Sequence, residues 1–292
     1  MKIGMTIEPF KGVNIKKVTS WLRLIQMDHL EINRRIIPFV KEFSTELGRT
    51  TTTFHLPIYD YDHFDLSSTE KQYESKIQET IQFINKYKEK LNLIYTLTHP
   101  PEGYYTDFEL LMTRLAQINT PILIENIKGQ SDEAFMDFYF KAKDRLGNQL
   151  AGYAIDAPHR YVTDWKNWLN IPPELLKEIV YVHISDCNRK KDLHEPLGEA
   201  SLPFNQFFEL LKSINYQGII LQEIKPKASE PEKVLDSSLY CIRPFSKQKY
   251  RRMKLLYSFI RPFIQWKIRS IFKRLKAQGQ SCLTKDLALE LI

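Results

Sequence analysis

Cysteines and long hydrophobic runs are scarce in this sequence, and both shortages narrow the class of protein. Its 292 residues include three cysteines, an odd number without a CxxC pair, which disfavours a disulfide framework and a thiolate zinc site. No uninterrupted run of about 18 apolar residues is present, so no membrane-spanning helix is expected. The first ten residues, MKIGMTIEPF, lack the apolar core of a signal peptide, and a reducing cytoplasm is therefore the expected location.

Acidic residues are scarce in only one part of the chain. Residues 246–292 contain twelve Lys and Arg but two acids, a net charge of +10. Residues 1–245 contain thirty Lys and Arg against thirty-three acids, a net charge of −3. We therefore predict a mildly acidic globular body, residues 1–244, followed by a basic amphipathic extension, residues 245–292.

Strand-like and helix-like segments alternate along the body. Eight short apolar or β-branched runs lie near residues 2–7, 30–32, 50–56, 91–97, 121–124, 150–155, 179–182 and 218–221. Helices are expected near residues 18–27, 38–47, 67–90, 107–118, 132–143, 202–214 and 230–239. Eight such repeats in about 240 residues predict an α/β fold, a (β/α)8 or TIM barrel, here with a basic C-terminal helical extension.

Residues that can bind metal follow six of the eight runs. The third to eighth runs end on a histidine or a carboxylate: His55, His99, Glu125, Asp156, His183 and Glu223. The carboxyl ends of the strands form the active-site rim of a TIM barrel. A single polar residue opening a loop is ordinary, but six on one rim are hard to obtain from solvated surface alone. The pattern predicts a metal site at this rim.

The loop after the seventh run, HISDCNRKKDLHEPLGE (residues 183–199), adds further ligand types in Asp186, Asp192 and His194. His159, three residues after Asp156, Asp192 and His194 extend the rim set to nine candidates. Five imidazoles and four carboxylates are too many for one tetrahedral ion. They suit Zn²⁺ or Mn²⁺ better than Mg²⁺, so we expect two or three ions. Clusters of such ions are typical of phosphodiester cleavage.

Several motifs resemble those of the xylose isomerase-like TIM-barrel superfamily, and most of all its endonuclease IV type of AP endonuclease. IENIKGQ (residues 124–130) is similar to that family's ENxxGQ, and DAPH (156–159) to its DxxH. DLHEPLGEA (192–200) is similar to DxHxxLGEG, with Ala200 in place of the last glycine. His99-Pro100 resembles the family's HP on the fourth strand. The resemblance covers roughly residues 1–240.

The resemblance implies three zinc ions on nine ligands. The first ion would lie on His55 and His99, and Glu125 would bridge it to the second. The second ion would also take the strand-end ligands Asp156, His183 and Glu223, and the third would take the loop ligands His159, Asp192 and His194. It also implies a metal-dependent phosphodiester hydrolase with Glu125 and Glu223 as catalytic carboxylates. Abasic-site DNA is one candidate substrate.

Two other functions remain open. A sugar or sugar-phosphate isomerase or epimerase would use one ion on the strand-end residues Glu125, Asp156, His183 and Glu223 to move a proton beside a carbonyl. The chain departs from the DNA-cleaving enzymes after His55, where a tyrosine arrives one place late as Tyr59, and its acidic body is not the surface of a barrel that grips a polyanion alone. A non-enzymatic binding scaffold would be expected to have lost ligands, and none is missing.

The basic extension has its own set of interpretations. Residues 247–276 contain eleven basic residues and no acid, interleaved with aromatic and aliphatic residues, and Pro262 is expected to break or kink a helix there. Such a segment suits an anionic membrane surface or the phosphates of a nucleic acid. A helix packed on the barrel, with a solvated basic face or a partner on it, is the simpler alternative.

Overall fold

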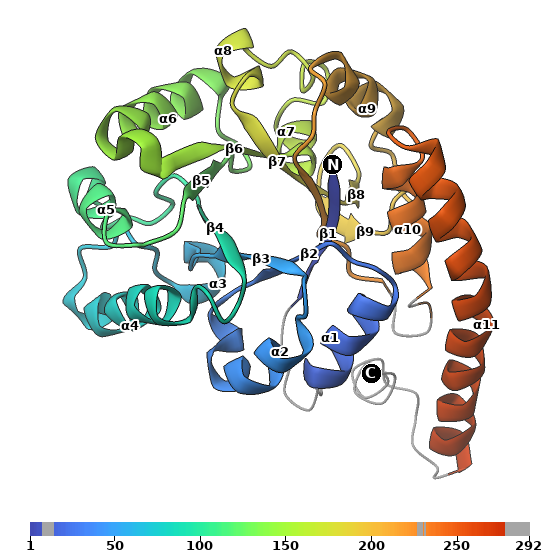
Figure 1. The fold of residues 1–292 in the computed structure, drawn as a ribbon. Coiled ribbons are helices and arrows are strands. Elements are labelled where there is room, and N and C mark those ends of the chain that lie inside the picture. Colours follow the sequence, from blue (N-terminus) through green and yellow to red (C-terminus); the bar gives the residue numbers. More distant parts are fainter. Residues whose placement is uncertain (8–14, 227–229, 231, 278–292) are drawn as a thin grey trace.

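Eight parallel strands close into a barrel at the centre of the computed structural model (Figure 1). The structure describes residues 1–7, 15–226, 230 and 232–277, with side chains through residue 266. Around the barrel the strands follow the order β1-β10-β7-β6-β5-β4-β3-β2. Their bounds are β1 (Lys2–Thr6), β2 (His29–Ile32), β3 (Thr51–His55), β4 (Leu93–Thr98), β5 (Ile122–Glu125), β6 (Leu150–Asp156), β7 (Ile179–Ile184) and β10 (Ile219–Gln222). The predicted TIM barrel is confirmed.

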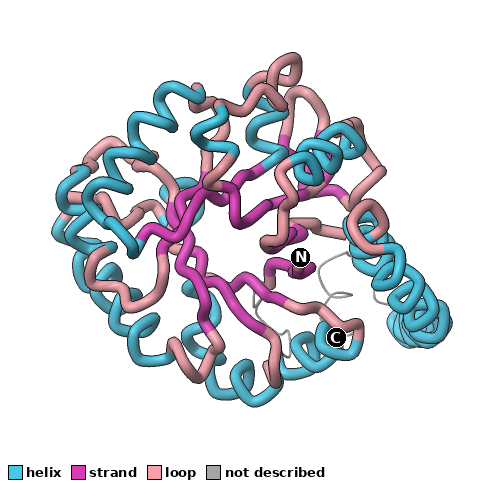
Figure 2. The backbone as a smooth tube through the Cα atoms, turned by 45° about the horizontal axis from the view of Figure 1, so that its top comes forward, coloured by secondary structure: helices cyan, strands magenta, loops and turns pink. Residues whose placement is uncertain are grey.

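Helices surround the barrel and cover the outer side of its strands (Figure 2). The α-helices are α1 (Ile15–Leu24), α2 (Val40–Glu46), α3 (Tyr59–Asp62), α4 (Lys71–Tyr87), α5 (Phe108–Leu115), α6 (Asp132–Leu146), α7 (Ala157–Thr163), α8 (Pro173–Leu176), α9 (Phe204–Ser213), α10 (Lys233–Ile242) and α11 (Lys247–Ala277). Two 3-10 helices are η1 (Arg34–Phe39) and η2 (Gly147–Gln149). The main core lies between strands and helices, and a smaller cluster that includes Leu123, Ala154, Tyr181 and Leu221 comes from the strands alone.

Two of the expected helices are present but begin as α-helices later than the sequence predicts. The helix expected over residues 38–47 begins as η1, where the Asn33 side chain accepts a hydrogen bond from the Arg35 amide. α4 begins at Lys71 without a side-chain cap, later than the expected start near residue 67, and the Ser68 Oγ accepts from the Glu70 amide in the turn before it.

Pro262 does not break the helix of the basic extension. α11 is continuous from Lys247 to Ala277 with Pro262 inside it. A proline removes the hydrogen bond to the carbonyl four residues earlier, here that of Ser258, and Ser258 is exposed, so water can hydrate its carbonyl. Among the described residues, no helix combines the length and apolarity needed to cross a bilayer.

The loop expected over residues 183–199 contains a small antiparallel ribbon, β8 (Asp186–Cys187) with β9 (Asp192–Glu195). Asp186, offered by the sequence as a ligand type, is buried and holds this loop instead. Its carboxylate accepts the backbone amides of Cys187, Gly198, Ala200 and Leu202 at 2.8–3.1 Å. The ribbon thus presents Asp192 and the residues after it to the rim.

Asp186→Ala is expected to lower the free energy of unfolding by about 3 kcal/mol or more, because each buried amide left without an acceptor costs about 1–3 kcal/mol. Asp186→Asn keeps one acceptor oxygen and should lie between the wild type and the alanine variant. Urea denaturation measures both. An alanine variant as stable as the wild type would contradict this role of Asp186.

Candidate metal centre

The period-two geometry of the strands carries five of the nine candidates to the rim above the inner apolar cluster. Side chains two residues apart on a strand point to the same side. The inner residues Leu97, Leu123, Ala154, Tyr181 and Leu221 each precede a rim residue by two positions: His99, Glu125, Asp156, His183 and Glu223. Strand pairing sets these side by side, as in the pair Asp156 and His183. The apolar interior below the rim raises the strength of every charge interaction above it.

Glu125, which is buried, lies at the centre of the cluster and faces histidines with both of its oxygens. Its Oε2 is 3.5 Å from His55 Nε2 and 3.4 Å from His99 Nε2. Its Oε1 is 3.0 Å from His183 Nδ1. One carboxylate oxygen thus serves the β3 and β4 side of the rim and the other serves the β7 side. This is the disposition of a carboxylate that bridges two ions.

Asp156 and Glu223 complete the side of the cluster around His183. Asp156 Oδ2 is 3.9 Å and Glu223 Oε2 is 3.7 Å from His183 Nδ1. The Asp156 Oδ1 atom accepts the backbone amide of His159 at 2.5 Å, and this bond begins α7 and turns the His159 ring toward the cluster. Three carboxylates therefore surround one imidazole nitrogen.

The remaining candidates form a neighbouring group on α7 and β9. Asp192 Oδ2 is 3.7 Å from His159 Nε2 and 3.3 Å from His194 Nε2. His194 adopts a left-handed backbone conformation (φ 50°), which a non-glycine residue adopts rarely. The structure thus brings all nine predicted residues into one connected set.

Four of the histidines share one orientation. In each, Nδ1 lies 2.5–3.0 Å from an oxygen outside the set of nine or from a backbone carbonyl, so that Nε2 faces the cluster. The pairs are His55 with the Leu56 carbonyl, His99 with the Glu102 carboxylate, His159 with the Asn126 carbonyl and His194 with the Glu223 carbonyl. Outer partners of this kind fix the tautomer and aim the ligand nitrogen of metal-binding histidines.

Glu31, at the end of β2, lies outside the set predicted from the sequence. Its Oε2 is 2.9 Å from His183 Nε2 and accepts the Tyr181 hydroxyl at 3.1 Å, while its Oε1 accepts from Thr6 at 3.4 Å. His183 is therefore held in the opposite sense to the other histidines, with Nε2 bound to Glu31 and Nδ1 facing the carboxylates. A carboxylate inside the four-residue strand His29-Leu30-Glu31-Ile32 was the available signal.

Glu31→Gln is expected to weaken metal binding about 10–100-fold without preventing folding, since outer-shell partners of metal ligands have effects of this size. The neutral amide keeps the volume of the side chain, but it removes the negative charge that faces the Nε2 atom of His183. Competition with a chromophoric chelator measures the affinity. Glu79→Gln, which changes an exposed carboxylate on α4, is the matched control, and equal affinities in the two variants would refute a positioning role for Glu31.

The charges of the cluster shift the pKa of its members strongly. Burial raises the pKa of Glu125, but the nearby His183 and His99 outweigh it and hold that pKa well below its usual range. Burial alone would lower the pKa of His99, yet Glu125 and the hydrogen bond with Glu102 raise it to about 10. Burial and the charge of Glu125 raise the pKa of Asp156. Without a metal ion, protons on the imidazoles compensate the buried carboxylates.

The unsatisfied polar atoms fit bound cations. His99 Nε2, Glu125 Oε2 and Asp156 Oδ2 are buried without a hydrogen-bond partner, an arrangement that is rare unless an ion or water completes it. Ligand atoms of His55, His99 and Glu125 lie within 4.8 Å of one another, as do those of Glu125, Asp156 and His159. Nitrogen and oxygen ligands in this mixture suit zinc or manganese.

The two histidines without a predicted metal role lie apart from this pattern. His29 is buried between Thr51 Oγ1 (2.9 Å) and Thr53 Oγ1 (3.0 Å). Burial, with Lys2 and His183 nearby, lowers the pKa of His29 to about 3, so this ring is neutral. His63 ends α3 in a left-handed conformation. Neither ring belongs to the ligand groups among the described residues.

The family model for the xylose isomerase-like TIM barrel matches residues 18–245. The chain belongs to this family. A protein named "Probable endonuclease 4" from Sulfurihydrogenibium sp. (strain YO3AOP1) is 25% identical over 199 residues, which cover 59% of this chain and 71% of that protein. This relative is named after endonuclease IV, the enzyme type whose motifs are similar to residues 124–130, 156–159 and 192–200 of this chain.

Solved structures with a similar barrel agree with this fold. A D-tagatose 3-epimerase-like protein has a TM-score of 0.64 at 20% identity and covers 84% of this chain and 97% of its own. An AP endonuclease of family 2 from Brucella melitensis has a TM-score of 0.58 at 14% identity and covers 77% of this chain and 94% of its own. At such identities the likeness shows the barrel and leaves the reaction to the residues of the rim.

Proposed function

We propose that this chain is a metal-dependent phosphodiester hydrolase of the endonuclease IV type, with two or three zinc or manganese ions at its rim. One observation carries the proposal: the buried Glu125 carboxylate has one oxygen beside His55 and His99 and the other beside His183. A site for one ion needs no such division. The endonuclease-named relative supports the same reading.

The nine residues would hold the ions in three groups. His55, His99 and one oxygen of Glu125 would hold the first. The other oxygen of Glu125 would join the group around His183 Nδ1, and the α7–β9 group would hold the third. When bound, ions in such clusters supply Lewis acidity to a phosphodiester, to water and to the leaving oxygen.

The chain's own residues prepare the site for an anionic substrate. The tip of the β8–β9 ribbon exposes Arg189, Lys190 and Lys191 directly before Asp192. Arg189 lies over the Trp165 ring, with its guanidinium carbon 4.0 Å from the ring centroid. Stacking limits the freedom of this cation beside the rim. These three cations give the ribbon tip a positive charge where a phosphate would approach, although the body as a whole is mildly acidic.

Glu125 and Glu223 have separate tasks in this proposal. Glu125 is 1% exposed and keeps its charge, so it organises the cluster from below. The side chain of Glu223 is 19% exposed, with Oε1 3.4 Å from Thr6 Oγ1 and Oε2 beside His183. It is the carboxylate that both touches the inner group and reaches solvent, which suits proton transfer with a bound substrate or water.

An epimerase or isomerase remains the second candidate, because Glu125, Asp156 and Glu223 also surround His183 Nδ1 as a site for one ion would require. Several structural neighbours are named as epimerases, including a 3-keto-D-glucoside 4-epimerase from E. coli with a TM-score of 0.61 at 16% identity, covering 83% of this chain and 99% of its own. This candidate assigns no metal role to His159 or His194.

The two candidates are separated by their substrates and by one variant. Zinc-loaded protein is assayed with bis(p-nitrophenyl) phosphate and an abasic-site duplex, and in parallel for epimerisation of ketohexoses. Hydrolysis lost in His159→Ala would support the proposal. Epimerisation that survives in the same variant, with no hydrolysis by the wild type, would replace it with the second candidate.

A further inference from the structure

We infer that α11 docks the protein onto an anionic lipid surface, through an exposed apolar stripe bordered by cations. The stripe consists of Leu255, Phe259, Phe263 and Trp266, which are 62%, 74%, 60% and 64% exposed. Spacings of four, four and three residues place them along one side of the helix over about 16 Å. The Phe263 and Trp266 rings pack together, with centroids 5.9 Å apart.

The opposite side of α11 is bound to the barrel, so the helix presents the stripe on a fixed support. Met253, Tyr257 and Ile264 are buried. The Tyr257 hydroxyl donates to the Ile25 carbonyl at 2.9 Å. In Figure 1, α11 lies outside α10 at the edge of the molecule. Packing against the body therefore does not explain the exposed stripe.

Other large apolar side chains are exposed on the described residues outside α11, and none of them continues the α11 stripe along that helix. They are Leu24, Tyr61, Tyr104, Tyr105, Trp165, Leu193 and Tyr240. Single exposed apolar residues are normal, whereas a contiguous group with polar borders marks an interaction surface. The α11 stripe is of the second kind.

The charges beside the stripe identify the chemistry of the partner. Residues 247–276 contain eleven basic residues and no acid, so the helix carries no anion of its own. Arg251, Arg252 and Lys254 are exposed and form no ion pair among the described side chains. Residues 1–245 have a net charge of −3, so the basic excess of the chain lies in residues 246–292, which include α11, and favours an anionic surface there.

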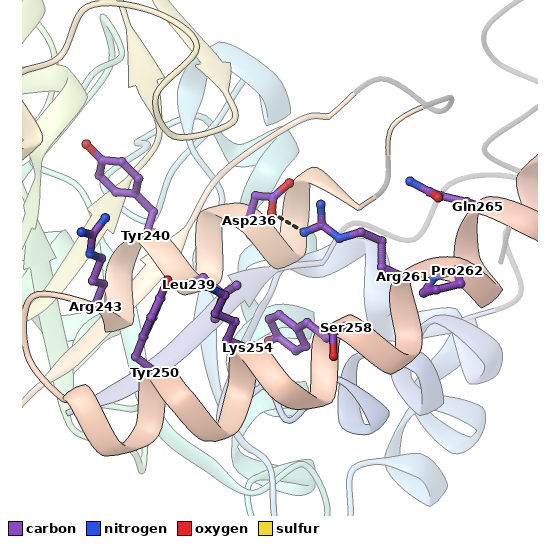
Figure 3. Close-up of a pocket in the computed structure, with 11 residues that line it drawn as sticks. Asp236, Leu239, Tyr240, Arg243, Tyr250, Lys254, Ser258, Arg261, Pro262 and Gln265 are labelled. Atoms are coloured by element: carbon purple, nitrogen blue, oxygen red, sulfur yellow. Dashed lines mark hydrogen bonds and ion pairs between the residues drawn. The ribbon is translucent and has the colours of Figure 1, made fainter.

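A groove of about 570 Å³ lies between α10 and α11 and is lined mainly by cations among its charged residues (Figure 3). Arg243, Lys254 and Arg261 line it, together with a single acid, Asp236, which pairs with Arg261. Arg243 and Lys254 therefore keep their charge available along the groove.

A lipid surface fits this face better than a nucleic acid does. Aromatic rings that stack on bases stand beside unstacked nucleotides, and an aliphatic side chain gains little there. The stripe includes the aliphatic Leu255, and the rings of Phe263 and Trp266 in the stripe already pack on one another. Basic helices with Leu, Phe and Trp on one face bury that face at the boundary between headgroups and acyl chains.

The test is flotation of the full chain with vesicles of phosphatidylcholine containing about 30 mol% phosphatidylglycerol, at roughly 0.1 M salt. Binding is expected, with pure phosphatidylcholine bound at least about tenfold more weakly. Phe259→Ser/Phe263→Ser and Arg251→Gln/Arg252→Gln should each reduce binding about tenfold or more, since each basic residue near the surface contributes about fivefold. Leu24→Ser on α1 and Lys86→Gln/Lys90→Gln, at the end of α4 and in the turn after it, are matched controls and should bind as the wild type does.

Two results would overturn the inference. One is no binding of the wild type to anionic vesicles. The other is a wild type that binds an undamaged DNA duplex but not vesicles, together with α11 variants that no longer bind this duplex. That result would assign this face to nucleic acid. Thermal melting of each variant, expected within about 2 °C of the wild type for these exposed positions, separates lost docking from lost folding. The α11 variants with reduced vesicle binding are expected to hydrolyse phosphodiesters at the wild-type rate.

Discussion

Replacing Glu125 with glutamine is expected to reduce phosphodiester hydrolysis by about 10³-fold or more, and to lower the number of ions that the protein retains. The amide keeps the volume of a side chain that is 1% exposed, so the barrel should fold. It offers only one oxygen, and its NH2 group would face either His55 and His99 or His183. Either orientation removes an anionic bridge between the two sides of the rim.

Turnover and bound metal are measured on the same preparation of the Glu125 variant. His183→Ala should have a similar effect, because it removes the nitrogen around which three carboxylates gather. Glu133→Gln changes an exposed carboxylate in the first turn of α6 and serves as the control. A Glu125→Gln protein with an undiminished rate would remove Glu125 from the active site.

Without metal, the protein is expected to lose about 2 kcal/mol of stability as the pH rises from 6.5 to 8.5. The pKa of His99 is about 10 in the fold and 6.5 for an ordinary histidine. Because the folded pKa is the higher one, the stabilisation is fully present below pH 6.5 and is lost as the pH rises toward 10. The pKa of His183 is raised in the same direction, against the effect of burial, by Glu125, Glu223 and Glu31.

A bound cation should reverse this dependence. Ligand nitrogens must give up their protons, so metal binding releases protons and becomes stronger as the pH rises. Urea denaturation at pH 6.5 and 8.5, with chelator or with stoichiometric zinc, measures both trends. His99→Gln should flatten the pH dependence of the metal-free protein. A metal-free wild type that is more stable at pH 8.5 than at pH 6.5 would contradict the charge balance described for this cluster.

The barrel and most of the rim could be predicted because both follow from local sequence. Each strand is a short apolar run, and a histidine or carboxylate at its end, such as Glu125 after Ile122–Ile124, must come to the carboxyl rim once eight such units close. The structure places the nine predicted residues together. Their role as metal ligands stays a prediction that bound metal will test.

What could not be predicted depends on contacts between distant parts of the chain. Asp186 has the residue type of a ligand, but backbone amides from residues 198–202 return to it and occupy both oxygens. Glu31 stands in an apolar strand, and only the closing of the barrel sets it against His183, 152 positions away. Pro262 was expected to break or kink a helix, and α11 is not broken there because water can hydrate the exposed Ser258 carbonyl that loses its hydrogen bond.

The number of metal ions per chain tests the central claim most directly. The protein is purified without chelator, and its zinc and manganese are determined by elemental analysis against the protein concentration. Two or three ions per chain are expected, falling in the Glu125→Gln variant. A single ion that added metal does not increase would contradict a divided Glu125 carboxylate and would favour the epimerase.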